Sequence, residues 1–263
     1  MKVVLLISCM HQKDADIIRR SNVQTDVVVV NQCDKDSVEE FDFSNIQGET
    51  CHAKFINTRE RGLSRSRNMA IANAWGDICL ISDDDERFED DYENKIITAY
   101  KENPTAGFVS FACVRESISY SKQPCRMGIL QILKTSSIQI TFKRQEILKH
   151  KILFDVIMGS GTGNGAGEEN RFMMDCRKAD IEMLYNPAVI TTLLSANSQW
   201  NNGLDEKYFR NRGWASRRIL GTGLGYLFIW YNIFSNRKRF INGGLSLAKI
   251  ICYFHKGFFE RRS

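Results

Sequence analysis

Short apolar runs separated by helix-like stretches are the feature that most constrains how this chain folds. The two kinds of segment alternate, with strand-like runs at 3–7, 26–30, 55–57 and 77–82 and helix-like stretches at 14–20 and 64–75. Because the runs are apolar on both faces, they belong in a sheet covered on both sides, and the alternation favours parallel pairing. We therefore predict an α/β fold with a mostly parallel sheet and helices on both faces.

The middle of the chain is richer in strand-like runs. A helix and three strands are predicted there, at 92–100, 107–114, 128–133 and 137–142. A glycine-rich stretch at 159–167 then leads into a helix that begins near Glu168. In parallel sheets ligands bind beyond the carboxyl ends of the strands, so the polar turns that follow the first strands should border one crevice.

An acidic turn follows one apolar run directly, and it consists of Asp83, Asp84, Asp85 and Glu86. Adjacent carboxylates repel one another, and a cation among them relieves the repulsion. In an extended segment Asp83 and Asp85 project to the same side, where one Mg²⁺ or Mn²⁺ ion, which also binds diphosphate, suits them. The position at the end of a buried strand favours a metal site over the alternative, a solvated acidic loop.

Three arginines stand just before or within the first turns of the helix predicted at 64–75, namely Arg61, Arg65 and Arg67. Guanidinium groups bind phosphate, and the amino-terminal end of a helix attracts anions. An Arg/Ser-rich stretch is also found in RNA-binding segments. The following residues have the pattern of a packed helix without an aromatic platform, so we expect no nucleic-acid partner.

The segment from Arg61 to Asp85 joins these two features, and it resembles the core of family 2 glycosyltransferases. The matching parts are Arg67-Asn68 in the helix, Gly76-Asp77 before the apolar strand, and the Asp-x-Asp pattern after it. The resemblance runs from Met1 to about Pro187. It implies the GT-A fold, a Rossmann-like sheet, with a catalytic domain at 1–203 divided into a nucleotide-sugar half at 1–100 and an acceptor half at 101–203.

The resemblance also implies roles for individual residues. Asp83 would contact the ribose or the metal, Asp85 would ligate the metal on the donor diphosphate, and Asp84 would lie beside the donor. Further donor-binding positions fall at Ser8, Arg61 and Arg67. Where the family has two acids at the end of the second strand, this chain has Asn31 and Gln32. Since an amide both donates and accepts hydrogen bonds, it can still bind a uracil edge, and a UDP-sugar is the favoured donor.

Glu168 and Glu169 open the helix after the glycine-rich stretch, where family members carry an acidic pair. Inversion at an anomeric carbon needs a carboxylate that accepts the proton of the attacking hydroxyl. We predict Glu169 as this base, with Glu168 as the competing choice. Stabilisation of the helix dipole by acids is the alternative, but it leaves the glycines, which are frequent in closing loops, without an explanation.

Processive members of the family show Gln-x-x-Arg-Trp. This chain carries Ser198, Gln199, Trp200 and Asn201 without that arginine, which predicts the transfer of a single sugar.

The last part of the chain, 204–263, is predicted to be a basic, aromatic, helical module. From Lys207 to Ser263 there are 12 Lys and Arg against one acid, Glu260, so this stretch carries +11 and the rest of the +5 chain carries −6. Its apolar run at 219–235 barely reaches the roughly 17 residues of a spanning helix and has arginines on both sides. We predict a module that lies on anionic cytoplasmic lipid. A packed helix pair with basic solvent faces is the alternative.

Eight cysteines occur without a Cys-x-x-Cys pair, and several lie in apolar runs, which is typical of reduced thiols in a cytosolic protein.

These features together predict an inverting hexosyl glycosyltransferase that uses Mn²⁺ or Mg²⁺. It would move one sugar from a nucleotide-sugar to a glycan or lipid-linked saccharide for surface polysaccharide assembly, at the inner face of a bacterial cell membrane. Two alternatives stay open. A metal-dependent nucleotidyltransferase also uses paired aspartates, and a glycosyltransferase-like scaffold could bind without catalysing, although the intact acid pairs argue against the scaffold.

Overall fold

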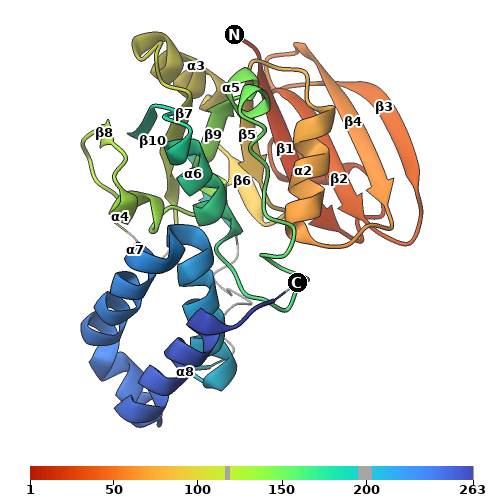
Figure 1. Ribbon diagram of the computed structural model, residues 1–263. Helices are drawn as coiled ribbons and strands as arrows, with labels where there is room; N and C mark the ends of the chain where they lie inside the picture. The colour runs from red at the N-terminus through yellow and green to blue at the C-terminus, as the bar shows by residue number, and fades with distance from the viewer. Residues whose placement is uncertain (116–118, 195–202, 263) are drawn as a thin grey trace.

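The protein was analysed as a computed structural model, which describes residues 1–115, 119–194 and 203–262. Its centre is a mixed sheet that runs through the upper part of Figure 1 in the order β3-β4-β2-β1-β5-β9-β7-β10-β6, with β8 paired to β10. The strands are β1 (Val3–Met10), β2 (Asp26–Gln32), β3 (Ser37–Ser44), β4 (Thr50–Thr58), β5 (Ile78–Ser82), β6 (Glu86–Phe88), β7 (Phe108–Val114), β8 (Cys125–Arg126), β9 (Ile140–Lys143) and β10 (Met183–Leu193).

The parallel part of the sheet is built from the apolar runs of the sequence. Strands β4, β2, β1 and β5 pair in parallel, with Leu5 opposite Val27 on one side and Leu80 on the other. The remaining strands are mixed, because β9 is antiparallel to both β5 and β7 whereas β7 and β10 are parallel. The carboxyl ends of β1, β2 and β5 therefore meet at one edge, as the prediction requires.

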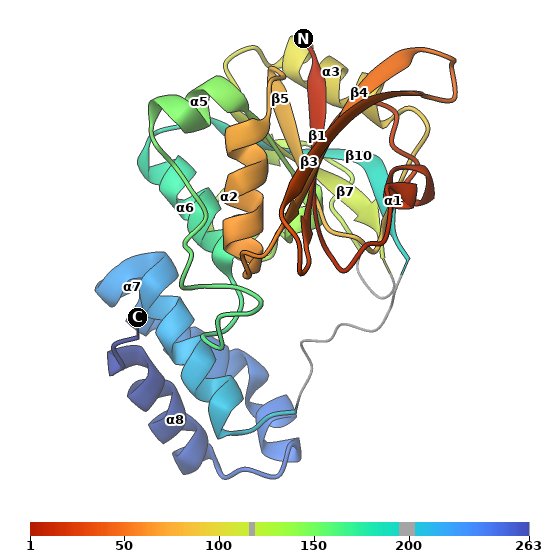
Figure 2. The ribbon, with the colours of Figure 1, turned by 90° about the vertical axis from the view of Figure 1, so that its right-hand side faces the viewer.

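Helices cover both faces of the sheet. One face carries α2 (Leu63–Asn73), α5 (Arg144–Lys149) and α6 (Glu168–Lys178), and the other carries α1 (Asp16–Arg20) and α3 (Tyr92–Glu102), as Figure 2 shows from the side. Along β1 the side chains alternate between the two cores, with Leu6 in one and Leu5 in the other. Both faces are apolar because both are covered. The predicted α/β architecture is confirmed.

Two local predictions were wrong. The run at 128–133 is not a strand but contains the short helix α4 (Ile129–Ile132), in which the Gln131 side chain accepts a hydrogen bond from the Gly128 amide at 2.7 Å. A short apolar run is ambiguous between the two states without its partners. The run at 137–142 begins with a 3₁₀ turn, η1 (Ser137–Gln139), and only then enters β9.

Strand β3 was not predicted, because it lies at the edge of the sheet and is rich in charge. Glu40 pairs with Lys54 of β4, and their Oε1 and Nζ atoms lie 3.1 Å apart. Charged side chains are a usual means of keeping an edge strand from pairing with another chain. They also remove the apolar signal by which a strand is recognised in a sequence.

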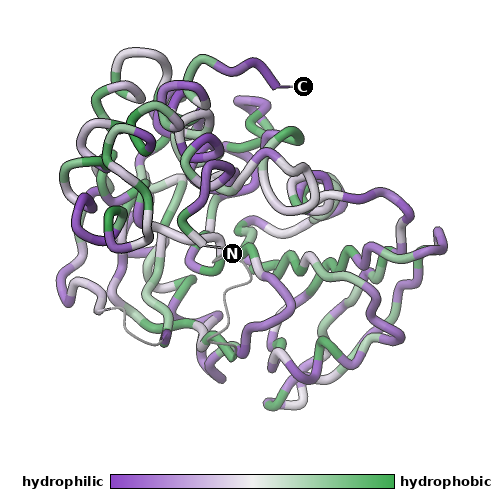
Figure 3. The backbone as a smooth tube through the Cα atoms, turned by 90° about the horizontal axis from the view of Figure 1, so that it is seen from below, coloured by the Kyte–Doolittle hydropathy of each residue, from purple (hydrophilic) through white to green (hydrophobic). Residues whose placement is uncertain are grey.

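The last part of the described chain is helical, as predicted. It comprises α7 (Glu206–Asn242), which is interrupted at Gly221 with φ 77°, and α8 (Leu247–Phe259), which packs along it. A separate aromatic core lies between them, made of Phe209, Ile229, Ile233, Phe240, Ile250, Phe254 and Phe258. Hydrophobic and hydrophilic stretches alternate around these helices, as Figure 3 shows from below. Among the described helices, none combines the length and the apolar character that crossing a membrane demands.

Glycines allow α7 and α8 to approach closely. A Cβ atom on Gly213 would lie 2.2 Å from the carbonyl oxygen of Phe254, and one on Gly257 would lie 2.0 Å from that of Arg210. Both distances are far below van der Waals contact, so only glycine fits at these two positions. The helix pair is therefore a built packing unit and not a loosely folded tail.

Candidate active site

A buried arginine joins three of the predicted site residues. Arg67, on α2, is 1% exposed, and its Nη2 donates to Oδ1 and Oδ2 of Asp83 at 2.9 and 3.1 Å. Its Nη1 donates to Oε1 of Glu168, at the start of α6, at 2.9 Å. The guanidinium also lies 5.3 Å from the ring centre of Phe154. The acidic turn, the basic helix and the acidic pair thus meet at one point.

The charges of this cluster stabilise one another. Burial lowers the pKa of the Arg67 guanidinium, but the carboxylates of Asp83 and Glu168 raise it by a larger amount. The net pKa therefore lies above its usual value. A buried guanidinium is costly unless it is paired and hydrogen-bonded. Here one cation faces two carboxylates, and its Nε has no hydrogen-bond partner among the described residues.

Asp83 is held from two further sides by residues that the sequence did not reveal as part of the site. Ser137 Oγ donates to Asp83 Oδ2 at 3.1 Å, and the Asp83 amide donates to Oε1 of Glu86 at 2.8 Å. Glu86 is fully buried, and burial raises its pKa well above the usual value. The alternation of Glu86, Arg87 and Phe88, which marks a short strand, is the signal that could have separated Glu86 from the acidic turn.

Asp84 and Asp85 differ from Asp83 in that neither is paired with a cation of the cluster. Burial raises the pKa of both, and the charge of Asp83 raises it further. Asp84 Oδ2 accepts one hydrogen bond, from Gln12 Nε2 at 3.3 Å. Mutual repulsion of this kind is relieved by a cation.

A divalent cation fits this turn only together with a ligand. Within the described ranges, no cluster of three or more His, Cys, Asp or Glu is arranged to hold a metal ion by itself. Mg²⁺ is usually bound by one or two carboxylates, with waters and substrate phosphates completing its coordination. Asp83 and Asp85 could supply these two carboxylates, although Asp83 also accepts hydrogen bonds from Arg67.

The predicted base-contacting residues lie at the carboxyl ends of β1 and β2, where they are buried and hydrogen-bonded. Ser8 Oγ accepts from Ser66 at 2.9 Å, and Gln32 Oε1 accepts from the Gly62 amide at 2.7 Å. The Asn31 amide bonds to both the N–H and the C=O of Gln12, each at 2.9 Å. Asn31 thus fixes the loop after β1. Contact of Ser8, Asn31 and Gln32 with the base of the nucleotide stays a prediction.

Arg61 and Arg65 form exposed pairs at the start of α2. Arg61 Nη2 lies 2.7 Å from Asp34 Oδ1, and Arg65 Nη1 lies 3.1 Å from Glu60 Oε1. Such exposed pairs are weak and can be exchanged for a phosphate at little cost. The helix start itself is partly covered, because the Leu63 amide donates to the Ser160 carbonyl at 3.1 Å.

The glycine-rich stretch 159–167 wraps around Glu168. Every second residue from Gly159 to Gly167 is a glycine with positive φ. A Cβ on Gly159 would lie 3.0 Å from Cδ of Glu168, and the Gly167 amide donates to Glu168 Oε2 at 3.1 Å. Together with Arg67, these contacts restrain Glu168 from both sides.

Glu169 is the less restrained of the two glutamates. It is partly buried, and burial, reinforced by repulsion from Glu168, raises its pKa to about 8. A general base works best when its pKa lies near the operating pH. The contacts therefore hold Glu168 in place, and the assignment of Glu169 as the base stays a prediction.

The family model for glycosyl transferase family 2 matches residues 15–163, which is more than half of the chain. The chain belongs to glycosyl transferase family 2. It is a glycosyltransferase, as predicted, and the match includes α2, the acidic turn and the first glycines of the loop. No curated protein shows significant sequence similarity to it.

Solved structures share the fold of this glycosyltransferase. TarS of S. aureus, residues 1–349 in complex with UDP-GlcNAc, is 13% identical with a TM-score of 0.64, over 98% of this chain and 89% of that one. A mannosyltransferase of Pyrobaculum calidifontis in complex with GDP-Man and Mn²⁺ is 12% identical with a TM-score of 0.53, over 99% and 88%. These likenesses confirm the GT-A fold. The residues Ser198, Gln199, Trp200 and Asn201, on which the prediction of a single transfer rests, lie outside the described residues.

Proposed function

We propose that this glycosyltransferase moves one sugar, with inversion, from a nucleotide-sugar, preferably a UDP-sugar, to a saccharide acceptor. The observation that carries the proposal is the contact of Arg67 with both Asp83 and Glu168. This contact brings the acidic turn next to the acidic pair, which supports a donor site and a base at one point. A scaffold without catalytic function has no need for a buried charge cluster at this point.

The side chains divide the work as follows. Glu169 accepts the proton of the acceptor hydroxyl while that oxygen attacks the anomeric carbon and the bond from that carbon to the diphosphate oxygen breaks. Arg61 helps to bind the diphosphate, and Ser8, Asn31 and Gln32 line the site of the nucleotide base. Asp85, together with Asp83, would hold Mn²⁺ or Mg²⁺, and Asp84 would lie beside the donor. That ion supplies charge neutralisation for the departing nucleoside diphosphate.

Two relatives of known structure support the donor class. One is bound to UDP-GlcNAc and the other to GDP-Man with Mn²⁺, so the shared fold accommodates a nucleotide-sugar and a divalent cation. The substitution of acids by Asn31 and Gln32 leaves an amide-rich end of β2, which suits the mixed donors and acceptors of uracil.

We also propose that residues 1–203 form the catalytic domain, with halves 1–100 and 101–203, and that residues 204–263 form a C-terminal module. The +11 charge of residues 207–263 supports binding of this module to the anionic inner face of a bacterial cell membrane. A lipid-linked saccharide or a growing glycan of a surface polysaccharide is then the acceptor that such a location makes available.

The test is a thermal-shift screen of UDP-, GDP- and dTDP-sugars and of nucleoside triphosphates, each with and without Mn²⁺. A ligand that binds only the folded state increases the free energy of unfolding, by about 2.7 kcal/mol at a hundredfold excess over Kd, and so raises the melting temperature. We expect Mn²⁺-dependent stabilisation by one nucleotide-sugar series, lost in Asp85→Ala and kept in Glu39→Ala, whose acid lies on the exposed edge strand β3.

The other outcomes are equally informative. Stabilisation by a nucleoside triphosphate alone would contradict the proposal and favour a nucleotidyltransferase. A shift that Asp85→Ala retains in full would remove Asp85 from the metal site. If no nucleotide of any kind stabilises the protein, the proposed donor class is wrong.

A further inference from the structure

The second half of α7, after the break at Gly221, exposes an apolar stripe. Leu224, Leu227, Tyr231 and Phe234 are each more than half exposed. Their spacing of three, four and three residues places them on one face of the helix. The opposite face is buried against α8 through Ile229 and Ile233 of the aromatic core. The stripe is therefore not the packing face of α7.

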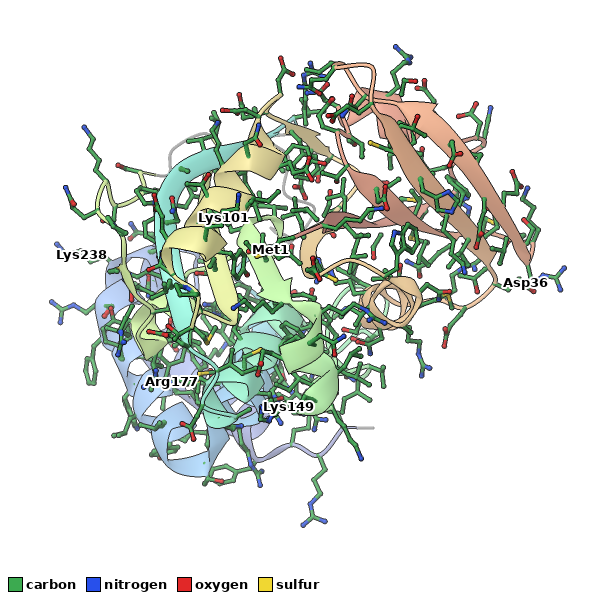
Figure 4. The ribbon with its side chains drawn as sticks, turned by 90° about the horizontal axis from the view of Figure 1, so that it is seen from above. Met1, Asp36, Lys101, Lys149, Arg177 and Lys238 are labelled. Atoms are coloured by element: carbon green, nitrogen blue, oxygen red, sulfur yellow. The ribbon has the colours of Figure 1, made fainter. Side chains whose placement is uncertain are left out.

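Positive charge flanks the stripe at its carboxyl end. Arg237, Lys238 and Arg239 follow Phe234 and are all exposed. Lys238 continues the stripe, four residues after Phe234, and lies at the outer edge of the molecule in Figure 4, far from Asp36 near the edge of the sheet. Apolar and cationic side chains thus lie together on an exposed part of α7.

We propose that this stripe, Leu224, Leu227, Tyr231 and Phe234, is the face that inserts into an anionic lipid surface, with Arg237, Lys238 and Arg239 on the headgroups. The inference deepens the proposed function, on which it rests, by naming the surface that contacts the membrane. Apolar and aromatic side chains beside cations are suited to the interface between acyl chains and anionic headgroups.

A lipid surface fits this face better than a second copy of the chain. Residues 207–263 carry +11, and their one acid, Glu260, is already paired with Arg210 and Arg262 at 2.9 Å each. Two such modules brought face to face repel each other, whereas anionic headgroups attract each of them. Charge complementarity therefore selects the membrane.

Contacts through α7 relate the inserted face to the active site. Arg262, after α8, donates from Nη1 to Asn211 Oδ1 at 2.6 Å and to the carbonyl of Asn164 in the glycine-rich loop at 3.2 Å. Asn211 in turn lies against Gly165, at the distance where a Cβ would touch it. Arg262 and Asn211 thus link the C-terminal helices, one of which carries the stripe, to the loop that surrounds Glu168.

The experiment is co-sedimentation of the full chain with vesicles of phosphatidylcholine alone or mixed with phosphatidylglycerol, at low and high salt. The test variant is the double substitution Leu227→Glu and Phe234→Glu. Its control is Val38→Glu, which places the same charge on a side chain that is 59% exposed in the edge strand β3. Binding needs no donor or acceptor, so this readout is independent of the glycosyltransferase reaction.

We expect wild type and Val38→Glu to bind the anionic vesicles, and the double variant to bind at least about tenfold more weakly. Part of the wild-type binding should persist at high salt, because apolar insertion is not screened. Equal binding by the double variant, or no binding by wild type, overturns the proposal. So does a wild-type dimer in sedimentation velocity that the double variant loses. A cooperative urea-unfolding transition like that of wild type verifies that the double variant is folded.

Discussion

Arg67 is a buried guanidinium that contacts two carboxylates from distant parts of the chain. Its partners Asp83 and Glu168 are separated from it by 16 and 101 residues. Removing one member of a buried charge group leaves the others desolvated and uncompensated, which costs more than the pair contributes when it is intact. Arg67 is thus expected to matter for folding as much as for donor binding.

Arg67→Met should lower the free energy of unfolding by about 3–5 kcal/mol, because Glu168 stays buried without its cation. Urea denaturation measures this loss. Arg65→Met is the matched control, since Arg65 lies on the same helix in an exposed pair with Glu60, and it should cost no more than about 1 kcal/mol. Adding Glu168→Gln to Arg67→Met should restore part of the stability. Equal losses in the two single variants would contradict a buried charge cluster.

Glu169 should govern the pH dependence of transfer. Its pKa is raised to about 8, and a general base acts in its deprotonated form. The value of kcat/KM is therefore expected to rise as the pH increases through about 8. Glu168→Gln should move this rise to lower pH because it removes the repulsion from Glu168. Glu169→Gln should lower transfer about 10²- to 10⁴-fold while donor binding is kept. An unchanged rate in Glu169→Gln would exclude it as the base.

At the scale of the element, the glycine-rich loop 159–167 has a defined backbone conformation and packs closely against its neighbours. Its glycines have positive φ, and four of the five lie close to other residues: Gly159 against Glu168, Gly161 against Gly62, Gly165 against Asn211 and Gly167 against Ile219. The loop thereby connects α2, α6 and α7. Such a segment is defined by backbone conformations that other residues adopt only with strain.

Gly159→Ala should reduce transfer more than Gly163→Ala. Both positions have positive φ, so both variants carry a strain of about 1–2 kcal/mol. At Gly163 no described atom lies within 4 Å of the added Cβ, whereas at Gly159 that atom meets Glu168 at 3.0 Å. Urea denaturation checks that the two variants are equally stable. A difference between their transfer rates then reports the displacement of Glu168. If the two variants transfer equally well, the position of Glu168 does not depend on its contact with Gly159.

At the scale of the whole molecule, α7 is joined to the catalytic part by apolar packing and by several polar contacts. Trp214, Ala215, Ile219 and Leu220 of α7 are buried in the core that also contains Phe172 of α6. Arg218 Nε lies 2.5 Å from Asp155 Oδ2, and the Arg171 side chain donates to the Arg218 carbonyl. Arg262 adds its hydrogen bonds to Asn164 and Asn211 and lies 5.3 Å from the ring of Trp214. The hydrogen bond from Arg262 to Asn164 therefore adds a polar contact at the glycine-rich loop to the apolar packing of α7.

Arg262→Ala should loosen the glycine-rich loop, because the hydrogen bond to the Asn164 carbonyl is lost together with the support of Asn211. Hydrogen bonds of a charged group contribute about 1.5–3 kcal/mol, so amide exchange in the loop, for example at Gly159, should accelerate about tenfold or more. The neighbouring exposed Arg261 provides the control, and Arg261→Ala should leave exchange unchanged. Unchanged exchange in Arg262→Ala would show that the loop does not depend on this arginine.

Much of the architecture was predictable from local patterns. The apolar runs of β1, β2 and β5 identify the parallel centre of the sheet because a strand covered on both faces must be apolar on both. The order of Arg67 and the acidic turn likewise indicated the family, and the family match over residues 15–163 bears this out. Strand β3 escaped prediction because an exposed edge strand carries charge instead of an apolar pattern.

The sequence by itself determined which residue types gather at the site, since their spacing along strands and helices sets which end of the sheet they reach. It also determined the charge and aromatic content of 204–263. Only the tertiary structure decided that Arg67 is buried between Asp83 and Glu168 and that Glu86 stands under the acidic turn. It likewise decided which face of α7 stays exposed. Burial and pairing depend on residues up to about a hundred positions away, and local sequence carries no information on those distances.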